Sequence, residues 1–250
     1  MPAPSRAQID PTARHRSRAR LFRVAAVAVT LAGVVVALVS ILEGSHDPNL
    51  SPGRPVPGAT RVLAPLAGIE QQGIELGDPH APVTLVEFGD LQSEDCARFA
   101  REELPEIVRR YVRTGRLLLV FRALDLIGPD SLRAARMALA LADQSRLFQF
   151  VTLMYAHQGD ENSEYVTGRY LRALSESIPG ADAPEALRTG GSAAVHAQLA
   201  AAQRLGARLG VTSAPFFLLY RSGQAPSRLR AAKLDTNSLG PSLQRLLGVP

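Results

Sequence analysis

A run of uncharged residues near the start of the chain most strongly constrains what it can fold into. The run covers Val24 to Leu42 and reads VAAVAVTLAGVVVALVSIL. As an α-helix it would be about 28 Å long, which matches the hydrocarbon thickness of a bilayer. A helix is required there because lipid offers the backbone amides no hydrogen-bond partners. We therefore predict one transmembrane helix at residues 24–42.

The charges on either side of this run predict its orientation. Residues 1–23 contain six arginines and one acid, whereas Glu43 and Asp47 follow the run. Positive residues stay in the cytoplasm, so we expect a cytoplasmic tail at 1–23 and an extracytoplasmic C-terminal part, as in a single-pass protein of the cell membrane. A cleaved signal peptide is the alternative, but its apolar core is normally shorter. The length of the run favours an uncleaved anchor, while the small residues between Ala37 and Ser45 leave cleavage open.

The arginine-rich tail also accounts for the charge of the whole chain. The net charge is +5 and the isoelectric point is near 10, values that usually suggest nucleic-acid binding. The first 23 residues carry this entire excess, because the remaining 227 contain 22 basic and 22 acidic residues. The basicity is therefore a topology signal, and we expect no nucleic-acid partner.

A proline-rich segment separates the predicted anchor from the rest of the chain. Residues 43–66 contain five prolines together with several glycines and serines. This composition predicts an extended linker that builds no core and holds the following domain away from the bilayer. Residues 67–250 are enough for one ordinary domain. Because Cys96 is the one cysteine, that domain depends on its hydrophobic core and not on an internal disulfide. We find no metal-ligand spacing and expect no cofactor.

Apolar periodicity predicts an alternating order of strands and helices in this domain. Two buried strands, Val83–Phe88 and Arg116–Phe121, flank a helix over 93–114 that Pro105 should kink. A strand, a helix and a strand in this order form a βαβ unit with a parallel pair. The elements expected after it are helices over Ser131–Leu141, Ser145–His157, Ser163–Leu174 and Ser192–Leu209, strands over Phe216–Tyr220 and Arg228–Leu234, and a helix over Thr236–Leu247.

This order is that of an α/β thioredoxin fold, βαβ and then ββα, with a helical insertion at about residues 129–209. The sequence resembles the DsbA-like thioredoxin family, the exported thiol–disulfide oxidoreductases, in Leu76–Phe99, Phe121–Asp130 and Gly210–Phe217. The resemblance implies thiol–disulfide exchange on extended or unfolded exported polypeptides, with a redox partner protein in trans. It covers nearly all of residues 68–250.

The sequence departs from this family at the residues that carry its chemistry. Where the family has Cys-x-x-Cys, this chain has Ser93-Glu94-Asp95-Cys96. Ser93 stands at the place of the attacking cysteine, and Cys96 at the place of the resolving one. Disulfide exchange needs an attacking thiolate and a second thiol, and serine supplies neither. Ser93 is still a very good N-cap, so we expect the helix to begin there without its nucleophile.

Cys96 has two interpretations. A thiol one turn into the helix and on its apolar face tends to be buried and inert, and Glu94 and Asp95 beside it would further disfavour its thiolate. The alternative is a reactive monothiol that forms mixed disulfides or pairs with a second chain. We favour the buried thiol.

Two further positions match the family. Pro215, preceded by Ala214, matches the cis-proline beside the active site, where the resemblance implies that the backbone pairs with an extended substrate peptide. Asp90 matches an acidic residue three positions before the motif. It either caps the start of the helix or preserves part of a proton path, and both interpretations stay open.

Three functional hypotheses follow. The first is a DsbA-like oxidoreductase that keeps some thiol chemistry through Cys96, with a second thiol supplied in trans. The second is a non-catalytic thioredoxin-fold module that binds peptide or protein near Pro215. The third is a structural or assembly protein of the cell envelope. The family favours oxidoreductase chemistry, whereas Ser93 favours lost or reduced dithiol activity.

Overall fold

A computed structural model of the chain describes residues 50–221, 224 and 227–228, all within the unit Asp47–Pro250. The predicted cytoplasmic tail at 1–23, the anchor at 24–42 and the C-terminal helix over 236–247 lie outside the described residues. Among the helices that are described, none combines the length and the apolar character needed to cross a bilayer. The anchor therefore stays a prediction.

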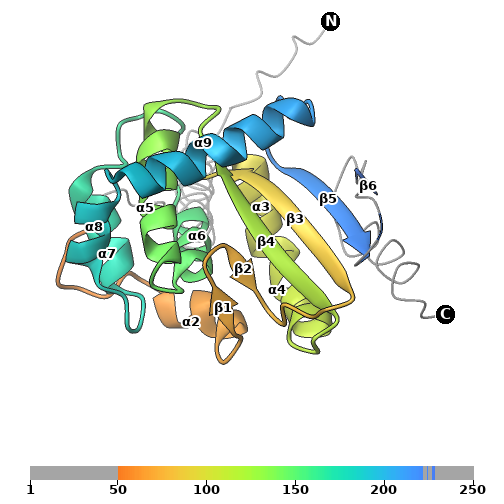
Figure 1. The fold of residues 1–250 in the computed structure, drawn as a ribbon. Coiled ribbons are helices and arrows are strands. Elements are labelled where there is room, and N and C mark those ends of the chain that lie inside the picture. The colour runs from red at the N-terminus through yellow and green to blue at the C-terminus, as the bar shows by residue number, and fades with distance from the viewer. Residues whose placement is uncertain (1–49, 222–223, 225–226, 229–250) are drawn as a thin grey trace, which may run out of the picture. The chain divides into compact units, whose positions relative to one another are not determined.

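The centre of the fold is a mixed sheet whose described strands run in the order β1-β2-β4-β3-β5-β6 (Figure 1). The middle strand β3 (Val83–Asp90) pairs in parallel with β4 (Leu117–Leu124) and antiparallel with β5 (Phe216–Arg221). A short hairpin and a two-residue strand form the two edges: β1 (Gln71–Gln72), β2 (Glu75–Leu76) and β6 (Ser227–Arg228). Every residue of β3 is buried, because both faces of a central strand are covered. The predicted βαβ unit with its parallel pair is confirmed.

The helix predicted over 93–114 is broken into three pieces. It consists of α3 (Glu94–Glu102), α4 (Leu104–Ile107) and one turn of π-helix, η2 (Val108–Val112). The break lies at Glu103, two residues before Pro105, because proline lacks the amide hydrogen and its ring clashes with the preceding turn. Pro105 therefore ends one helix and begins the next, which is stronger than the kink that we predict.

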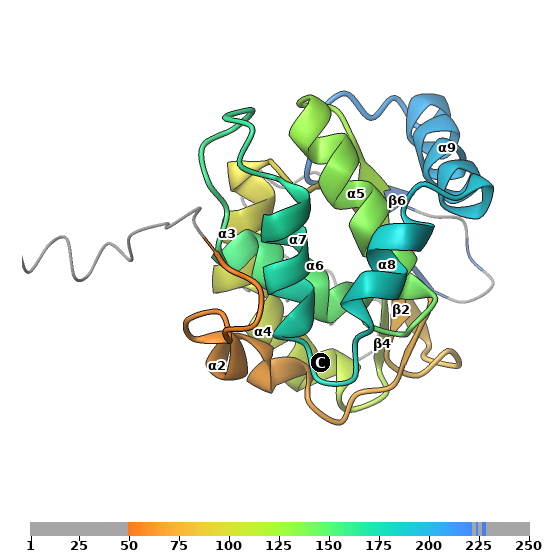
Figure 2. The ribbon, with the colours of Figure 1, turned by 90° about the vertical axis from the view of Figure 1, so that its left-hand side faces the viewer.

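The helical insertion contains one more helix than its periodicity predicts. It comprises α5 (Pro129–Ala142), α6 (Leu147–Ala156), α7 (Gly168–Glu176), α8 (Ala183–Thr189) and α9 (Ala193–Arg208). The additional helix α8 has seven residues and is capped by Asp182, whose carboxylate accepts from the Glu185 amide at 2.9 Å. Two turns are too few for a periodic apolar stripe to stand out. Figure 2 shows α5 to α8 gathered together, facing the viewer.

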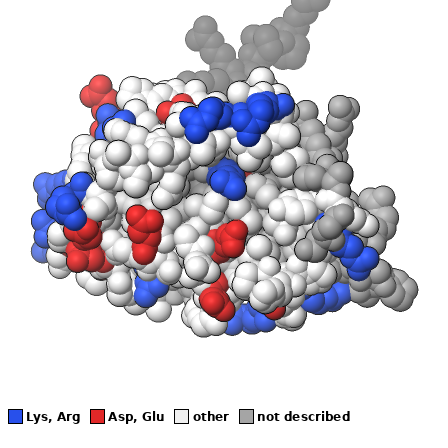
Figure 3. Space-filling view, in the orientation of Figure 1, with Lys and Arg blue, Asp and Glu red and all other residues white. Residues whose placement is uncertain are grey.

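The two faces of the sheet bury different residues, as the period of two along a strand requires. Leu85 belongs to the larger core, which also contains Cys96 and Phe99 of α3 and buried residues of α5 and α6. Val86 and Phe88 point to the other face, where Leu205 of α9 packs. Figure 1 accordingly shows α9 on the opposite side of the sheet from α3 and α4. Figure 3 shows basic side chains over α9, with acidic ones on the same face of the molecule.

The predicted linker at 43–66 is wrong for the part that the structure describes. Residues 59–66 form α2 (Ala59–Leu63) and a short 3₁₀ turn, η1 (Ala64–Leu66), and α2 packs on α6. Leu50, Val56, Ala59 and Leu66 are buried in the main core. Two backbone amides are also tied to the end of α7, since Gly53 donates to Glu176 at 2.7 Å and Val56 donates to Ser177 at 2.9 Å. Pro52 and Pro57 lie in turns between buried apolar residues, so composition alone gives the wrong state here.

Candidate functional site

The candidate site begins where β3 ends and α3 starts. Ser93 is the N-cap of α3, with its hydroxyl oxygen accepting from the Cys96 amide at 3.3 Å. The same hydroxyl donates to the carbonyl oxygen of Ala214 at 3.1 Å. The N-cap prediction is confirmed, and the side chain also has a second partner across the fold. Its one donor and one of its two acceptor sites are thus used within the protein.

The loop before β5 lies against this helix start. The Ala214–Pro215 peptide bond is cis, as the family resemblance implies. Thr212 and Ser213 are exposed, and Ala214 and Pro215 are half-buried, so the loop can be reached from solvent. The structure therefore brings together three of the predicted site residues, Ser93, Ala214 and Pro215.

The thiol of Cys96 lies inside the core. The side chain has no exposed surface, and its sulfur is in hydrogen-bond contact with the hydroxyl of Tyr155. Burial, with a smaller contribution from the nearby Glu87 carboxyl, raises the pKa of the Cys96 thiol to about 12. A thiol with such a pKa is almost wholly protonated at neutral pH and is a poor nucleophile. These values favour the buried, inert interpretation.

The acid that acts on Cys96 is not one of those next to it in sequence. Glu94 and Asp95 are both exposed at the surface of α3, where solvent screens their charges. The electrostatic contribution to Cys96 comes from Glu87 on β3. The prediction that Glu94 and Asp95 disfavour the thiolate of Cys96 is therefore wrong. Glu87, which lies in the sheet, has that effect instead.

Glu87 is the residue of this site that sequence reasoning misses. It lies on the middle strand, pairs with Phe121 and Phe217, and is only 3 % exposed. Burial raises the pKa of the Glu87 carboxyl to about 8, and its Oε1 atom has no hydrogen-bond partner in the part of the chain that is described. The signal was present in the sequence, because Glu87 is the one charged residue in the predicted strand Val83–Phe88 and lies on the same face as Leu85.

The side chain of Tyr155, on α6, forms the buried bottom of the site. Its hydroxyl donates to the backbone oxygen of Asp90 at 3.2 Å, and burial holds its pKa well above the usual value. Gly89 allows this approach: a Cβ atom there would lie 2.6 Å from the Phe121 ring and 3.0 Å from the Tyr155 hydroxyl. Cys96, Glu87 and Tyr155 thus form a buried group of three titratable side chains beneath the start of α3.

The side chain of Asp90 links two loops through hydrogen bonds. Its Oδ1 atom accepts from the Gln92 amide at 2.8 Å and from the Ser131 hydroxyl at 2.6 Å. Its Oδ2 atom accepts from the amides of Leu126 and Ile127, at 2.7 and 3.1 Å. The carboxylate is fully buried and holds the turn before α3 against the loop before α5. These four hydrogen bonds favour a structural role at the start of the helix over a proton path.

The helical insertion is also hydrogen-bonded to Gln92, the residue before Ser93. Gln92 donates from its side-chain amide to the Tyr165 hydroxyl at 2.7 Å and accepts from the Asn162 amide at 3.2 Å. Tyr165 and Asn162 lie in the segment between α6 and α7. No pattern in the sequence links residues so far apart, and this contact was not predicted. Within residues 50–221, no cluster of three or more His, Cys, Asp or Glu is arranged to hold a metal ion.

Three features define a DsbA-like thioredoxin-fold protein: a sheet of this order, a helix that starts beside a cis-proline loop, and a helical insertion. The chain belongs to the thioredoxin family, whose sequence model matches residues 70–219. A curated relative, the "Probable disulfide bond formation protein D" of Bacillus anthracis, is 32 % identical over 110 residues, which cover 43 % of this chain and 51 % of that protein. The chain thus spans about half the length of the curated relatives that it matches first.

Solved structures agree on the fold. Oxidised BdbD from Bacillus subtilis has a TM-score of 0.63 at 19 % identity, covering 80 % of this chain and 98 % of that chain. A thioredoxin-like oxidoreductase from Silicibacter pomeroyi has a TM-score of 0.56 at 27 % identity, covering 70 % and 92 %. The first likeness, at its low identity, concerns the fold alone.

Proposed function

We propose that this protein is a membrane-anchored, extracytoplasmic member of the DsbA-like family that has lost dithiol exchange. In its place, the loop at Ala214 and Pro215 binds extended segments of exported polypeptides. Residues 24–42 would hold the domain at the membrane, on the side where such polypeptides emerge.

The observation that carries this proposal is the bonding of Ser93. Its hydroxyl caps α3 and donates to Ala214, and a hydroxyl forms no disulfide. The second thiol needed for exchange is also missing, because Cys96 is the one cysteine of the chain and is fully buried. The scaffold that positions a nucleophile is therefore kept without the nucleophile.

The peptide-binding part of the proposal is supported by the cis-proline loop. Its residues 212–215 are exposed or half-buried, and an extended peptide can pair with backbone groups that solvent reaches. Ser93 holds this loop against α3 through the Ala214 carbonyl, so that the binding edge is ordered before a peptide arrives. Preformed edges lose less entropy on binding.

The protein is expected to show no dithiol–disulfide turnover. The reason is that the thiolate that attacks and the thiol that resolves the mixed disulfide cannot both be supplied by one buried cysteine. Oxidative refolding of a reduced, disulfide-containing substrate measures this, with a Cys-x-x-Cys member of the family as the positive control. Turnover comparable to that control would refute the loss of dithiol exchange, and Cys96 trapped in a mixed disulfide after acid quenching would instead support exchange in trans.

Replacing Pro215 by threonine is expected to weaken the binding of an extended, unfolded peptide about tenfold. The change disturbs the backbone that would pair with the peptide, and one or two lost hydrogen bonds correspond to about that factor. Fluorescence anisotropy of a labelled, permanently unfolded peptide provides the measurement. Pro79→Thr is the matched control, because Pro79 is exposed in the turn at the opposite end of β3. Equal binding by both variants would place the peptide site elsewhere.

A further inference from the structure

A second hollow lies at the end of α3 that is remote from Ser93. This cavity has a volume of about 340 Å³, which falls within the range of small-molecule sites in proteins. Its walls come from three places in the chain: the segment of α2 and η1, the junction of α3 with α4, and α6. None of the residues of the candidate site described above lines it.

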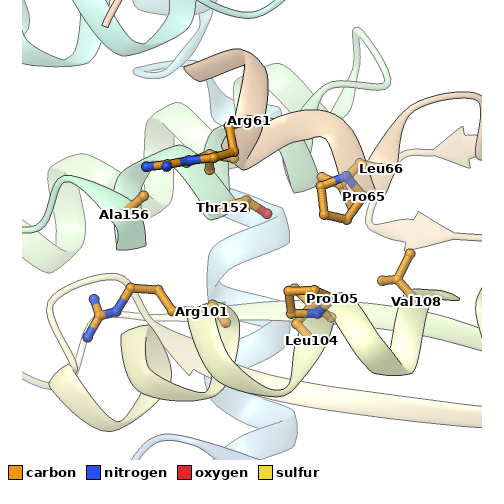
Figure 4. A pocket seen from close by; sticks show the side chains of 11 residues that line it. Arg61, Pro65, Leu66, Arg101, Leu104, Pro105, Val108, Thr152 and Ala156 are labelled. Carbon is orange, nitrogen blue, oxygen red and sulfur yellow. The ribbon is translucent and has the colours of Figure 1, made fainter. Parts of the chain in front are cut away.

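The walls of this cavity are divided into a charged end and an apolar end. Figure 4 shows Arg61 and Arg101 at one end, with Pro65, Leu66 and Val108 at the other. No aspartate or glutamate is among the lining residues. The cavity therefore presents positive charge at one end only, and that charge is not balanced by an acid in its own walls.

The lining offers few hydrogen-bonding groups other than these arginines. The hydroxyl of Thr152 donates to the backbone oxygen of Phe148 at 2.7 Å. Arg101 uses its Nη1 atom to donate to the Tyr155 carbonyl at 2.9 Å, which fixes the side chain and leaves its other amino groups available. Arg61 is exposed on α2. A peptide in this cavity would leave its backbone amides unsatisfied against apolar walls, which is unfavourable.

We infer that this cavity binds a single-chain fatty-acid carboxylate of about eight to ten carbons. The carboxylate would lie between Arg61 and Arg101, since guanidinium groups bind carboxylates through paired hydrogen bonds. The chain would extend towards Leu66 and Val108. A methylene group is close in size to a water molecule, which occupies about 30 Å³ in the liquid, so the cavity holds on the order of ten such groups. A two-chain phospholipid exceeds this volume.

This inference is independent of the proposed thiol and peptide chemistry. It uses the helical segment at 59–66, which is the part of the chain that composition alone assigns to a linker. That segment provides Arg61 and much of the apolar end. A ligand here would therefore also tie α2 and η1 to α4 and α6.

Photolabelling of the full 250-residue chain in membranes tests the inference. The probes are decanoate with a diazirine on its chain and the matching diazirine decanol, with labelled residues mapped by tandem mass spectrometry. We expect both probes to label the apolar end, around Leu66, Leu104 and Val108, and decanoate to label it more. Arg61→Gln should lower decanoate labelling about tenfold, the value of one charged hydrogen bond, and leave decanol labelling unchanged. Arg204→Gln, on the exposed side of α9, is the matched control and should change neither.

Filling the cavity provides a second test that does not depend on charge. Ala156 is half-buried in its wall, and Ala156→Leu should reduce labelling by both probes while circular dichroism stays unchanged. Unlabelled octanoate should compete roughly fifteenfold more weakly than decanoate, because each buried methylene contributes about fourfold in affinity. Labelling spread evenly over the surface, or equal labelling of the wild type and Ala156→Leu, would overturn the proposed site. An equal loss of both probes in Arg61→Gln would overturn the role of the carboxylate.

Discussion

Replacing Ser93 by cysteine is expected to create a reducible intramolecular disulfide with Cys96. Residues three apart in a helix have Cα atoms about 5 Å apart, which lies within the range of roughly 4.4–6.8 Å that a disulfide spans. Ser93 is already aimed correctly, because its hydroxyl contacts the Cys96 amide. Mass spectrometry of the oxidised and reduced protein after alkylation measures the bond directly.

The new thiol at position 93 is also expected to be unusually acidic. It would lie at the N-terminus of α3, where free amides and the helix dipole stabilise a thiolate. Alkylation at neutral pH should therefore be much faster at position 93 than at Cys96, whose pKa burial raises to about 12. Ser93→Cys has the largest expected effect of these substitutions, because it gives a chain without dithiol exchange both of the thiols that exchange needs.

Ser93→Ala is the control for this experiment. It removes the same hydroxyl, is expected to lower the free energy of unfolding by about 1 kcal/mol through loss of the N-cap, and forms no disulfide. If Ser93→Cys keeps two free thiols under mild oxidation while remaining folded, the geometry at the start of α3 is not that of a thiol–disulfide site. The claim that only the nucleophile has been lost would then fail.

The free energy of unfolding is expected to fall as the pH rises from about 4.5 to about 8 because of Glu87. Burial raises the pKa of this carboxyl from 4.5 to about 8. Within that window the folded chain keeps a proton that the unfolded chain has released, so rising pH favours unfolding. The stabilisation is fully present below pH 4.5 and is lost by about pH 8, and it amounts to about 5 kcal/mol.

Glu87→Gln should remove this pH dependence, because an amide of nearly the same shape does not ionise. The variant should match the wild type near pH 4.5 and be more stable at pH 8 by most of that amount. The chain has no tryptophan, so urea unfolding of residues 47–250 is best followed by circular dichroism. Glu102→Gln, on the exposed side of α3, controls for the loss of one negative charge. Parallel stability curves for the wild type and Glu87→Gln would show that Glu87 is already ionised in the folded state.

Local chemistry was enough to predict the parts of this protein that are contiguous in sequence. The strand predicted at Val83–Phe88, the cap at Ser93 and the absence of a second thiol depend on neighbouring residues or on residue type alone. The family resemblance added the loop at Ala214 and Pro215. These features are decided over a few residues, by backbone propensity, capping and the presence or absence of a sulfur atom.

Only the tertiary structure decided what surrounds them. Three sets of interactions join different segments of the chain: the hydrogen bond of Cys96 with Tyr155 and the electrostatic effect of Glu87 on it, the hydrogen bond of Gln92 to Tyr165, and the packing of residues 50–66 onto α6 and α7. A proline-rich segment can be an exposed linker, or it can pack on the core and form the wall of a cavity. The outcome depends on whether the core has a complementary surface for the apolar residues of the segment. Burial and the pKa shifts that follow from it are properties of the packed chain, so a sequence names the groups but does not set their surroundings.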